Sequence, residues 1–258
     1  MFVLEVEMTK KKDEHLLVTI GKARFENPDE NSVHLVDDEE ANSFLNDIVN
    51  FPHAFVLACC MDRQVKAEIA WMIPIRIRSI VGDFSINTLK KISLDEYLRI
   101  FNKNTLHRFN DTMAKVFYNA VQKIADEYEG DASKIWAGNP SSAAVVYRFL
   151  QFDGVGIKIA TMATNILARQ FKVPFSDYYS IDISPDVHIL RVLRRSGLVD
   201  RDASIDSIIY KARELCPEFP GIIDFSCWEI GRTWCRPRNP NCEDCIIESE
   251  CLKNMLVE

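Results

Sequence analysis

Four cysteines near the end of the sequence have the spacing of metal ligands. They follow the pattern Cys-x6-Cys-x2-Cys-x5-Cys within 17 residues and are Cys235, Cys242, Cys245 and Cys251. Four thiolates this close together can hold a tetrahedral zinc ion or an iron–sulfur cluster. The spacing alone favours neither zinc nor an iron–sulfur cluster clearly. Cys216 and Cys227 fall outside the pattern, and we expect them to be packed thiols.

A glycine-rich turn followed by a lysine is the second candidate site. Gly154, Val155 and Gly156 separate two stretches whose apolar residues recur at helical spacing, and Lys158 begins the second stretch. We predict a tight turn between two helices, in which the glycines allow positive φ or close approach of another backbone. Free amide N–H groups and the positive end of the second helix would then meet at one point, where phosphate binds. By itself, Gly-x-Gly-x-Lys predicts phosphate binding weakly, because most such loops only connect helices.

The hairpin and a downstream aspartate together resemble the endonuclease III superfamily of helix–hairpin–helix (HhH-GPD) DNA glycosylases. In that family such a hairpin is followed by a lysine, and an aspartate stands later in an Asp-x-His-x-x-Arg-Val setting. Residues 186–192, which begin with Asp186, match this element residue for residue. Residues 230–235 and 241–249 closely resemble the [4Fe–4S] loop of endonuclease III and of adenine glycosylases. The resemblance covers about residues 45–252 and favours a [4Fe–4S] cluster over zinc.

The resemblance implies a base-excision-repair enzyme that removes a damaged or mismatched base from double-stranded DNA. Asp186 would stabilise the positive charge that builds on the sugar, or would activate the nucleophile. Lys158 would attack C1′ as a neutral amine and form a Schiff base, whose β-elimination nicks the strand (AP lyase activity). The hairpin amides would hold a backbone phosphate. Arg63 or Gln64 would plug the duplex where the base has been flipped out, the alternative being a solvated helix–helix turn.

The same resemblance implies a mostly α fold with two lobes, a helical barrel and an iron–sulfur lobe, and DNA in the cleft between them. We expect residues 1–40 to pack on the cluster lobe, a barrel domain over 41–165 that ends in the hairpin, and a cluster domain over 166–258. Lys158 and Asp186 would face each other in the cleft.

Local patterns predict several further elements. Residues 2–8 alternate in polarity and residues 16–25 are rich in β-branched and apolar side chains, which favours a small N-terminal β-hairpin. Asp37 or Asp38 is placed to cap a helix that runs toward residue 49. Helices are also expected from Pro52 to about residue 61, from residue 67 to Pro74, and along the apolar stripe at residues 109–124.

Length and composition limit the class of protein. The chain has 258 residues, of which 47% are hydrophobic, so it can bury a sizeable core as one large or two modest domains. Its longest apolar run, residues 54–61, is too short to span a bilayer, and charged residues leave no apolar stretch for a signal peptide. We expect an intracellular monomer of the cytoplasm or nucleoid, without a membrane partner. A net charge of −7 argues against non-specific coating of nucleic acid and is compatible with a local basic face.

Two features weigh against the enzyme hypothesis. Asp153 stands where the family usually has proline, which puts a negative charge beside the phosphate-binding turn, and the whole chain is acidic. A second hypothesis is therefore a non-catalytic DNA-binding or structure-sensing module that keeps the hairpin and the cluster, in which Lys158 only binds phosphate. A third is a zinc-bearing helical scaffold that does not touch DNA.

Overall fold

The computed structural model describes residues 14–27 and 36–254, and this part of the chain is helical, without a β-strand. Its α-helices are α1 (Leu16–Glu26), α2 (Glu39–Asn46), α3 (Pro52–Met61), α4 (Ala67–Val81), α5 (Ile86–Leu89), α6 (Leu94–Asn104), α7 (Asn110–Glu127), α8 (Ser142–Leu150), α9 (Ile157–Arg169), α10 (Val187–Ser196), α11 (Ile205–Leu215) and α12 (Asp224–Thr233). Short 3-10 helices lie between them at η2 (Ala132–Ile135), η3 (Pro220–Ile223) and η4 (Glu248–Glu250). The mostly α fold class predicted from the sequence is confirmed.

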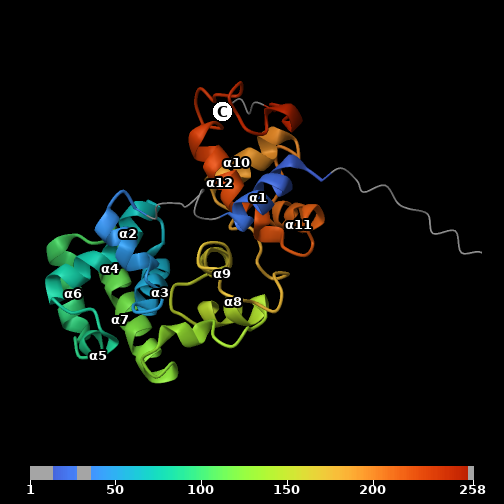
Figure 1. Cartoon of the computed structure of the whole chain (residues 1–258). Helices are drawn as coiled ribbons and strands as arrows, with labels where there is room; N and C mark the ends of the chain where they lie inside the picture. The colour runs from blue at the N-terminus through green and yellow to red at the C-terminus, as the bar shows by residue number, and fades with distance from the viewer. Residues whose placement is uncertain (1–13, 28–35, 255–258) are drawn as a thin grey trace, which may run out of the picture.

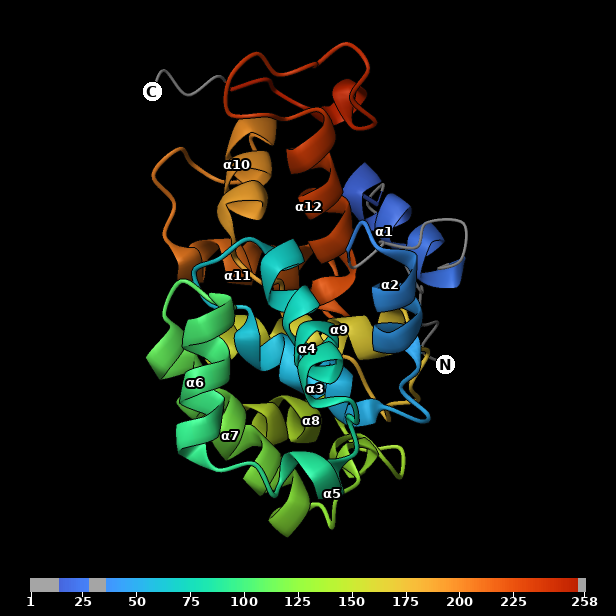
Figure 2. The same cartoon turned by 90° about the vertical axis from the view of Figure 1, so that its left-hand side faces the viewer.

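The helices form two groups with α9 between them (Figure 1). Helices α2 to α8 gather on one side, and α1 lies with α10 to α12 on the other. In Figure 2, α10 and α12 run beside each other, and the loop that follows α12 lies beyond their far ends. The predicted domain boundary at residue 165 falls inside α9, which continues to Arg169, and the division into domains stays a prediction.

Helix α3 is the centre of the first group. Every residue from Ala54 to Met61 is fully buried, and the helix contacts α2, α4, α7, α9 and η2. A helix that is apolar on all sides has to be covered on all sides, so the most apolar stretch of the sequence becomes its core. Pro52 begins this helix as predicted, at the position where its missing N–H costs nothing.

Helix α4 continues beyond its predicted end. Pro74 lies inside the helix, and the chain stays helical to Val81, where Gly82 ends it in the left-handed conformation with φ of 83°. Ile75 and Ile77 are buried, so the turns after the proline contribute to the core. The packing of these side chains outweighs the backbone hydrogen bond that a proline removes.

The predicted N-terminal β-hairpin is wrong in its second half. Residues 16–26 form α1, while residues 2–8 lie outside the described residues. Leu17, Val18 and Gly21 are buried, and α1 contacts η3 and α12. A Cβ atom on Gly21 would overlap the backbone of Ile222, so the helix approaches η3 very closely. Tertiary packing therefore decides the conformation of this β-branched stretch.

The other local predictions are confirmed. Asp38 caps α2 by accepting a hydrogen bond from the amide of Ala41 at 2.8 Å. The apolar stripe forms α7, and the glycine-rich turn lies between α8 and α9. Within the described ranges, every helix is too short or too polar to cross a membrane.

Candidate active site

A cleft of about 1290 Å³ runs along α9, between the two groups of helices. The end of α3, the start of α4 and the N-termini of α10 and α12 complete its walls. It is lined by most of the residues that the sequence singled out for DNA chemistry: Arg63, Gln64, Gly156, Lys158 and Asp186. The fold thus brings residues far apart in the sequence into one cavity.

The turn between α8 and α9 uses its two glycines differently. Gly154 has φ of 76°, and a Cβ there would lie 3.3 Å from Cγ2 of Val116. Gly156 has φ of −97° and is extended, so positive φ, one of the two reasons predicted for these glycines, is found at Gly154 and not at Gly156. Apart from its two neighbours in the chain, no described residue has an atom within 4 Å of a Cβ built on Gly156. Gly156 is the N-cap of α9 and provides no side chain to occupy the first amides of that helix.

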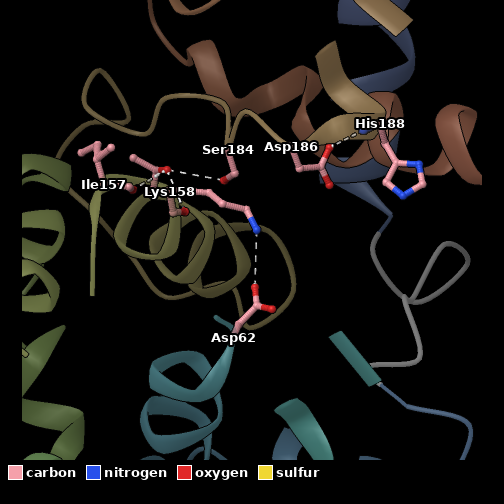
Figure 3. A network of polar contacts seen from close by, with 7 residues as sticks. Asp62, Ile157, Lys158, Ser184, Asp186 and His188 are labelled. Atoms are coloured by element: carbon pink, nitrogen blue, oxygen red, sulfur yellow. Dashed lines mark hydrogen bonds and ion pairs between the residues drawn. The ribbon is translucent and has the colours of Figure 1, made fainter. Parts of the chain in front are cut away.

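Lys158 extends from the first turn of α9 into the cleft. Its side chain is 44% exposed, and its Nζ lies 3.8 Å from Oδ2 of Asp62. Figure 3 shows the amine directed toward Asp62, with Asp186 on another wall of the same cavity. The ion pair of Lys158 is therefore formed with a residue that the sequence did not single out, while Asp186 lines the same cavity.

Asp62 follows the last residue of α3 and is only 8% exposed. Burial raises the pKa of its carboxyl, and the charge of Lys158 opposes that rise. The signal available in the sequence was the position of Asp62 next to the turn at residues 63–66. Its partner, however, lies 96 residues further along the chain.

Asp186 is fixed by the helix that it begins. As the N-cap of α10, its Oδ1 accepts hydrogen bonds from the amides of His188 at 2.8 Å and Ile189 at 2.9 Å. The carboxylate also complements the positive end of the helix dipole. These bonds hold the side chain at the cleft wall in one orientation (Figure 3).

The histidine and arginine that follow Asp186 connect α10 to α12. Arg191 donates to the carbonyl of Gly231 at 2.7 Å and to the carbonyl of Cys235 at 2.6 Å, and its Nη2 lies 3.0 Å from Nδ1 of His188. A Cβ on Gly231 would lie 2.6 Å from the Cβ of His188, so the two helices are in close contact. The motif therefore positions Asp186 and the start of the cysteine loop together.

Asp224 is a cleft residue that the sequence reasoning missed. It is the first residue of α12, it is partly buried, and its Oδ1 accepts a hydrogen bond from the amide of Ser184. Burial is the main cause that raises the pKa of Asp224 to about 7. No sequence motif marks this residue, because its surroundings are formed by α9 and by the segment before α10.

The turn that was expected to plug the duplex lies at the rim of the cleft. Arg63 and Gln64 are both exposed, and Gln64 has φ of 55°, which is uncommon for a residue other than glycine. A Cβ on Gly154 would lie 3.7 Å from Nη1 of Arg63, so this turn is next to the hairpin.

The four clustered cysteines line one small cavity, together with Val192 of α10 and Ile230 of α12. All four are free thiols of intermediate burial, and Nη1 of Arg195 lies 3.9 Å from Sγ of Cys235. As placed, no three histidine, cysteine or acidic side chains within residues 14–27 and 36–254 form a group that could hold a metal ion. The donor set itself, four thiols around one cavity with a cation beside it, fits a tetrathiolate centre. Cys216 and Cys227 are buried elsewhere as packed thiols, as predicted.

Comparisons with known proteins agree with this architecture. No protein-family model matches the sequence. Over 103 residues the chain is 32% identical to endonuclease III of Thermotoga maritima, a match that covers 40% of this chain and 43% of that protein. A solved structure of a trapped endonuclease III–DNA covalent intermediate superposes with a TM-score of 0.56 at 17% identity. That match covers 83% of this chain and 95% of the other.

The chain has the endonuclease III fold. A thermostable thymine-DNA glycosylase has the same architecture, with a TM-score of 0.56 at 14% identity over 83% of this chain and 96% of that structure. The chain matches less than half the length of its endonuclease III relative. The fold is shared, and the activity has to be argued from the residues of the cleft.

Proposed function

We propose that this protein is a base-excision-repair DNA glycosylase that cleaves the N-glycosidic bond of a damaged or mismatched base and then nicks the strand as an AP lyase. The observation that carries the proposal is the presence of Lys158 and Asp186 in one cleft, each in or at the first turn of a helix. A nucleophilic amine and a fixed carboxylate are the two groups that base excision by a lysine requires.

The reaction begins with a neutral amine at Lys158. Asp62, at 3.8 Å, is close enough to receive the proton of the ammonium group after a small side-chain rotation. The amine attacks C1′ of the flipped nucleotide, the base leaves, and the resulting Schiff base undergoes β-elimination. Asp186 stabilises the positive charge of the sugar while the bond to the base breaks.

DNA binding is assigned to the hairpin and to the neighbouring turn. The uncapped first amides of α9 and the open space above Gly156 suit a backbone phosphate. Exposed Gln64, with Arg63 beside it, is placed to fill the gap that a flipped nucleotide leaves in the duplex. The protein would bind double-stranded DNA as an intracellular monomer.

The cysteine loop would hold a [4Fe–4S] cluster through Cys235, Cys242, Cys245 and Cys251. When bound, the cluster would tie residues 235–251 into one fixed loop. Arg195 of α10 donates to the carbonyls of Arg236 at 2.7 Å and Pro237 at 3.0 Å and so attaches the start of this loop to the helix that carries Asp186.

A panel of duplexes, each with a single lesion, tests the proposal. The lesions are oxidised pyrimidines, 8-oxoguanine, mismatched thymine or uracil, and alkylated purines, and each product is analysed with and without alkali. Cleavage only after alkali shows base release, and cleavage without alkali shows AP lyase activity as well. Tight binding to duplexes with no excision of any base would instead support the non-catalytic module.

A further inference from the structure

Asp224 is a carboxyl group of the cleft that the reaction above does not use. Unlike Asp62, it forms no ion pair with any residue that the structure describes. Among the described residues, Ser184 provides its one hydrogen bond, to Oδ1. Oδ2 accepts no hydrogen bond from a described residue, and Asp224 lines the cleft. Because Oδ1 already accepts a bond from Ser184, Oδ2 is the oxygen that remains available for a ligand.

Contacts link this carboxyl to the lysine. Oγ1 of Thr161 lies 3.2 Å from the carbonyl of Lys158 and 3.4 Å from Oγ of Ser184, whose amide binds Asp224. Ser184 is also two residues before Asp186. A short path of hydrogen bonds thus connects the backbone of Lys158 to the carboxyl of Asp224, and Asp186 lines the same cavity.

The charged groups that face Asp224 explain how it can keep a proton. Asp186 at the start of α10 disfavours a second negative charge, whereas Lys158 and Arg169 on α9 favour it. From α12 itself, Cys227 lies one turn further on and is buried. Among its other neighbours, η3 carries no titratable side chain, and Arg24 of α1 is paired with Glu229. The balance of burial and charge puts the pKa of Asp224 at about 7, which is near the optimum for a proton donor at neutral pH.

We propose that Asp224 is a catalytic residue, the general acid that protonates the departing base. This inference rests on the proposed glycosylase activity and adds a residue to it. The C1′–N bond breaks, its electron pair goes to the base, and the proton on Oδ2 of Asp224 moves to a nitrogen or oxygen atom of the base. The amine of Lys158 forms the new bond to C1′. The products are a neutral base, a carboxylate at Asp224 and a lysine–sugar adduct with one positive charge, so atoms and charges balance.

Three of the carboxyl groups that line the cleft then have different tasks. Asp186 accepts two amide hydrogen bonds and carries the negative charge that the sugar requires. Asp62 is paired with Lys158 and handles the proton of the amine. Asp224, beside Asp186, provides the proton for the leaving base. Placing titratable groups in contrasting environments is how one site supplies both an acid and a base at the same pH.

Two reactions separate this role from the rest of the mechanism. Release of a base needs a leaving-group proton, whereas borohydride trapping on a preformed abasic site does not, since no base is present. Asp224→Asn keeps the acceptor for Ser184 and removes the proton. We expect it to slow base release at least about 100-fold and to trap on the abasic site at the wild-type rate.

The pH dependence and a matched variant complete the test. In the wild type, the ratio of base-release rate to trapping rate should fall as pH rises through about 7, and in Asp224→Asn this ratio should be low and flat. Asp224→Glu should restore part of the base release. Asp182→Asn removes a similar charge outside the cleft, where Asp182 binds Arg213, and should leave both rates unchanged.

The outcomes are distinguishable. Base release by Asp224→Asn at the wild-type rate, or an equal loss of trapping and base release, would overturn the role of Asp224 and leave the glycosylase in place. A wild-type protein that traps an abasic site but releases none of the bases would also overturn it. Absence of both activities in the wild type would remove the proposed function itself.

Discussion

The functional residues of the cleft and those of the cysteine loop are brought together in different ways. The cleft takes Asp62, Lys158, Asp186 and Asp224 from segments up to 162 positions apart and holds them by the packing of α3, α9, α10 and α12. The loop takes its four thiols from 17 consecutive residues, and its backbone has little regular structure besides η4. The cleft is therefore a product of the hydrophobic core, whereas the loop would depend on the cluster that we propose for it. A single substitution in the cleft should therefore reduce catalysis and leave the fold intact, whereas a single substitution of a cysteine in the loop should reduce the stability of the protein.

The two regions are nevertheless attached to each other. Arg191 and Arg195 of α10 donate to carbonyls between Gly231 and Pro237, so the helix that carries Asp186 also holds the start of the cysteine loop. Loss of the loop should disturb the cleft, while loss of a cleft side chain should leave the loop intact.

The largest expected effect is on the loop side. Substitution of Cys245 by serine should give insoluble or unstable protein, because a structural metal centre contributes its binding energy directly to folding. Cys216→Ala removes a buried thiol away from the loop and should be mild. Soluble yield and thermal unfolding of the two variants measure the difference.

Wild-type protein purified without oxygen should be brown, with about four irons per chain. A colourless protein with stoichiometric zinc would contradict the cluster.

The next effect is on catalysis without unfolding. Asp186→Asn keeps a good N-cap for α10, so the fold should be retained. Its charge matters mainly when the sugar becomes positive, and we expect base release to fall about 100-fold with DNA affinity nearly unchanged. Single-turnover rates and equilibrium binding measure the two separately. A parallel loss of thermal stability would show that the residue is structural.

The difference between local and distant residues also explains what the sequence could predict. The apolar run that becomes α3, the cap at Asp38 and the glycine turn before α9 are signals within one element, and the structure confirms them. Asp62 and Asp224 were missed because their partners come from other elements, which no local pattern brings together. Helix α1 was misread because its contact with η3, through Gly21, outweighs the β-branched content of the stretch. Pro74 was misread because buried Ile75 and Ile77 after it keep α4 helical.

A smaller effect is expected at the hairpin. Gly156 has ordinary backbone angles and open space around it, so alanine there should leave the fold intact and reach into the position of the phosphate. Affinity should fall several-fold for all duplexes alike, because phosphate contacts carry no sequence information. Gly154→Ala is the contrasting variant, since its φ of 76° and its contact with Val116 make it a stability mutation. Unchanged affinity in Gly156→Ala would mean that the turn only connects two helices.

The smallest effect is on stability as a function of pH. The folded state raises the pKa of Asp224 from 3.8 to about 7, so folding favours its protonated form. The stability that this provides is complete below pH 3.8 and is lost as pH rises through about 7. The asparagine of Asp224→Asn stays neutral at every pH, so the stability of this variant does not fall in the same way. Its melting temperature should rise relative to the wild type between these pH values, by about 2–4 °C for each kcal/mol of unfolding free energy that the wild type loses. Thermal unfolding at pH 5 and pH 8 measures this, and a constant difference would contradict the raised pKa.

The central claim is that Lys158 attacks the sugar, and borohydride trapping tests it most directly. Wild-type protein mixed with borohydride and a duplex that contains an abasic site should form a covalent protein–DNA adduct, because the reductant fixes an imine that only an amine can form. Lys158→Gln should bind the same duplex and form no adduct, with Lys66→Gln, at the rim of the same cleft, as a control that still traps. An adduct formed by Lys158→Gln at the wild-type rate would contradict the account, since another amine would then be the nucleophile.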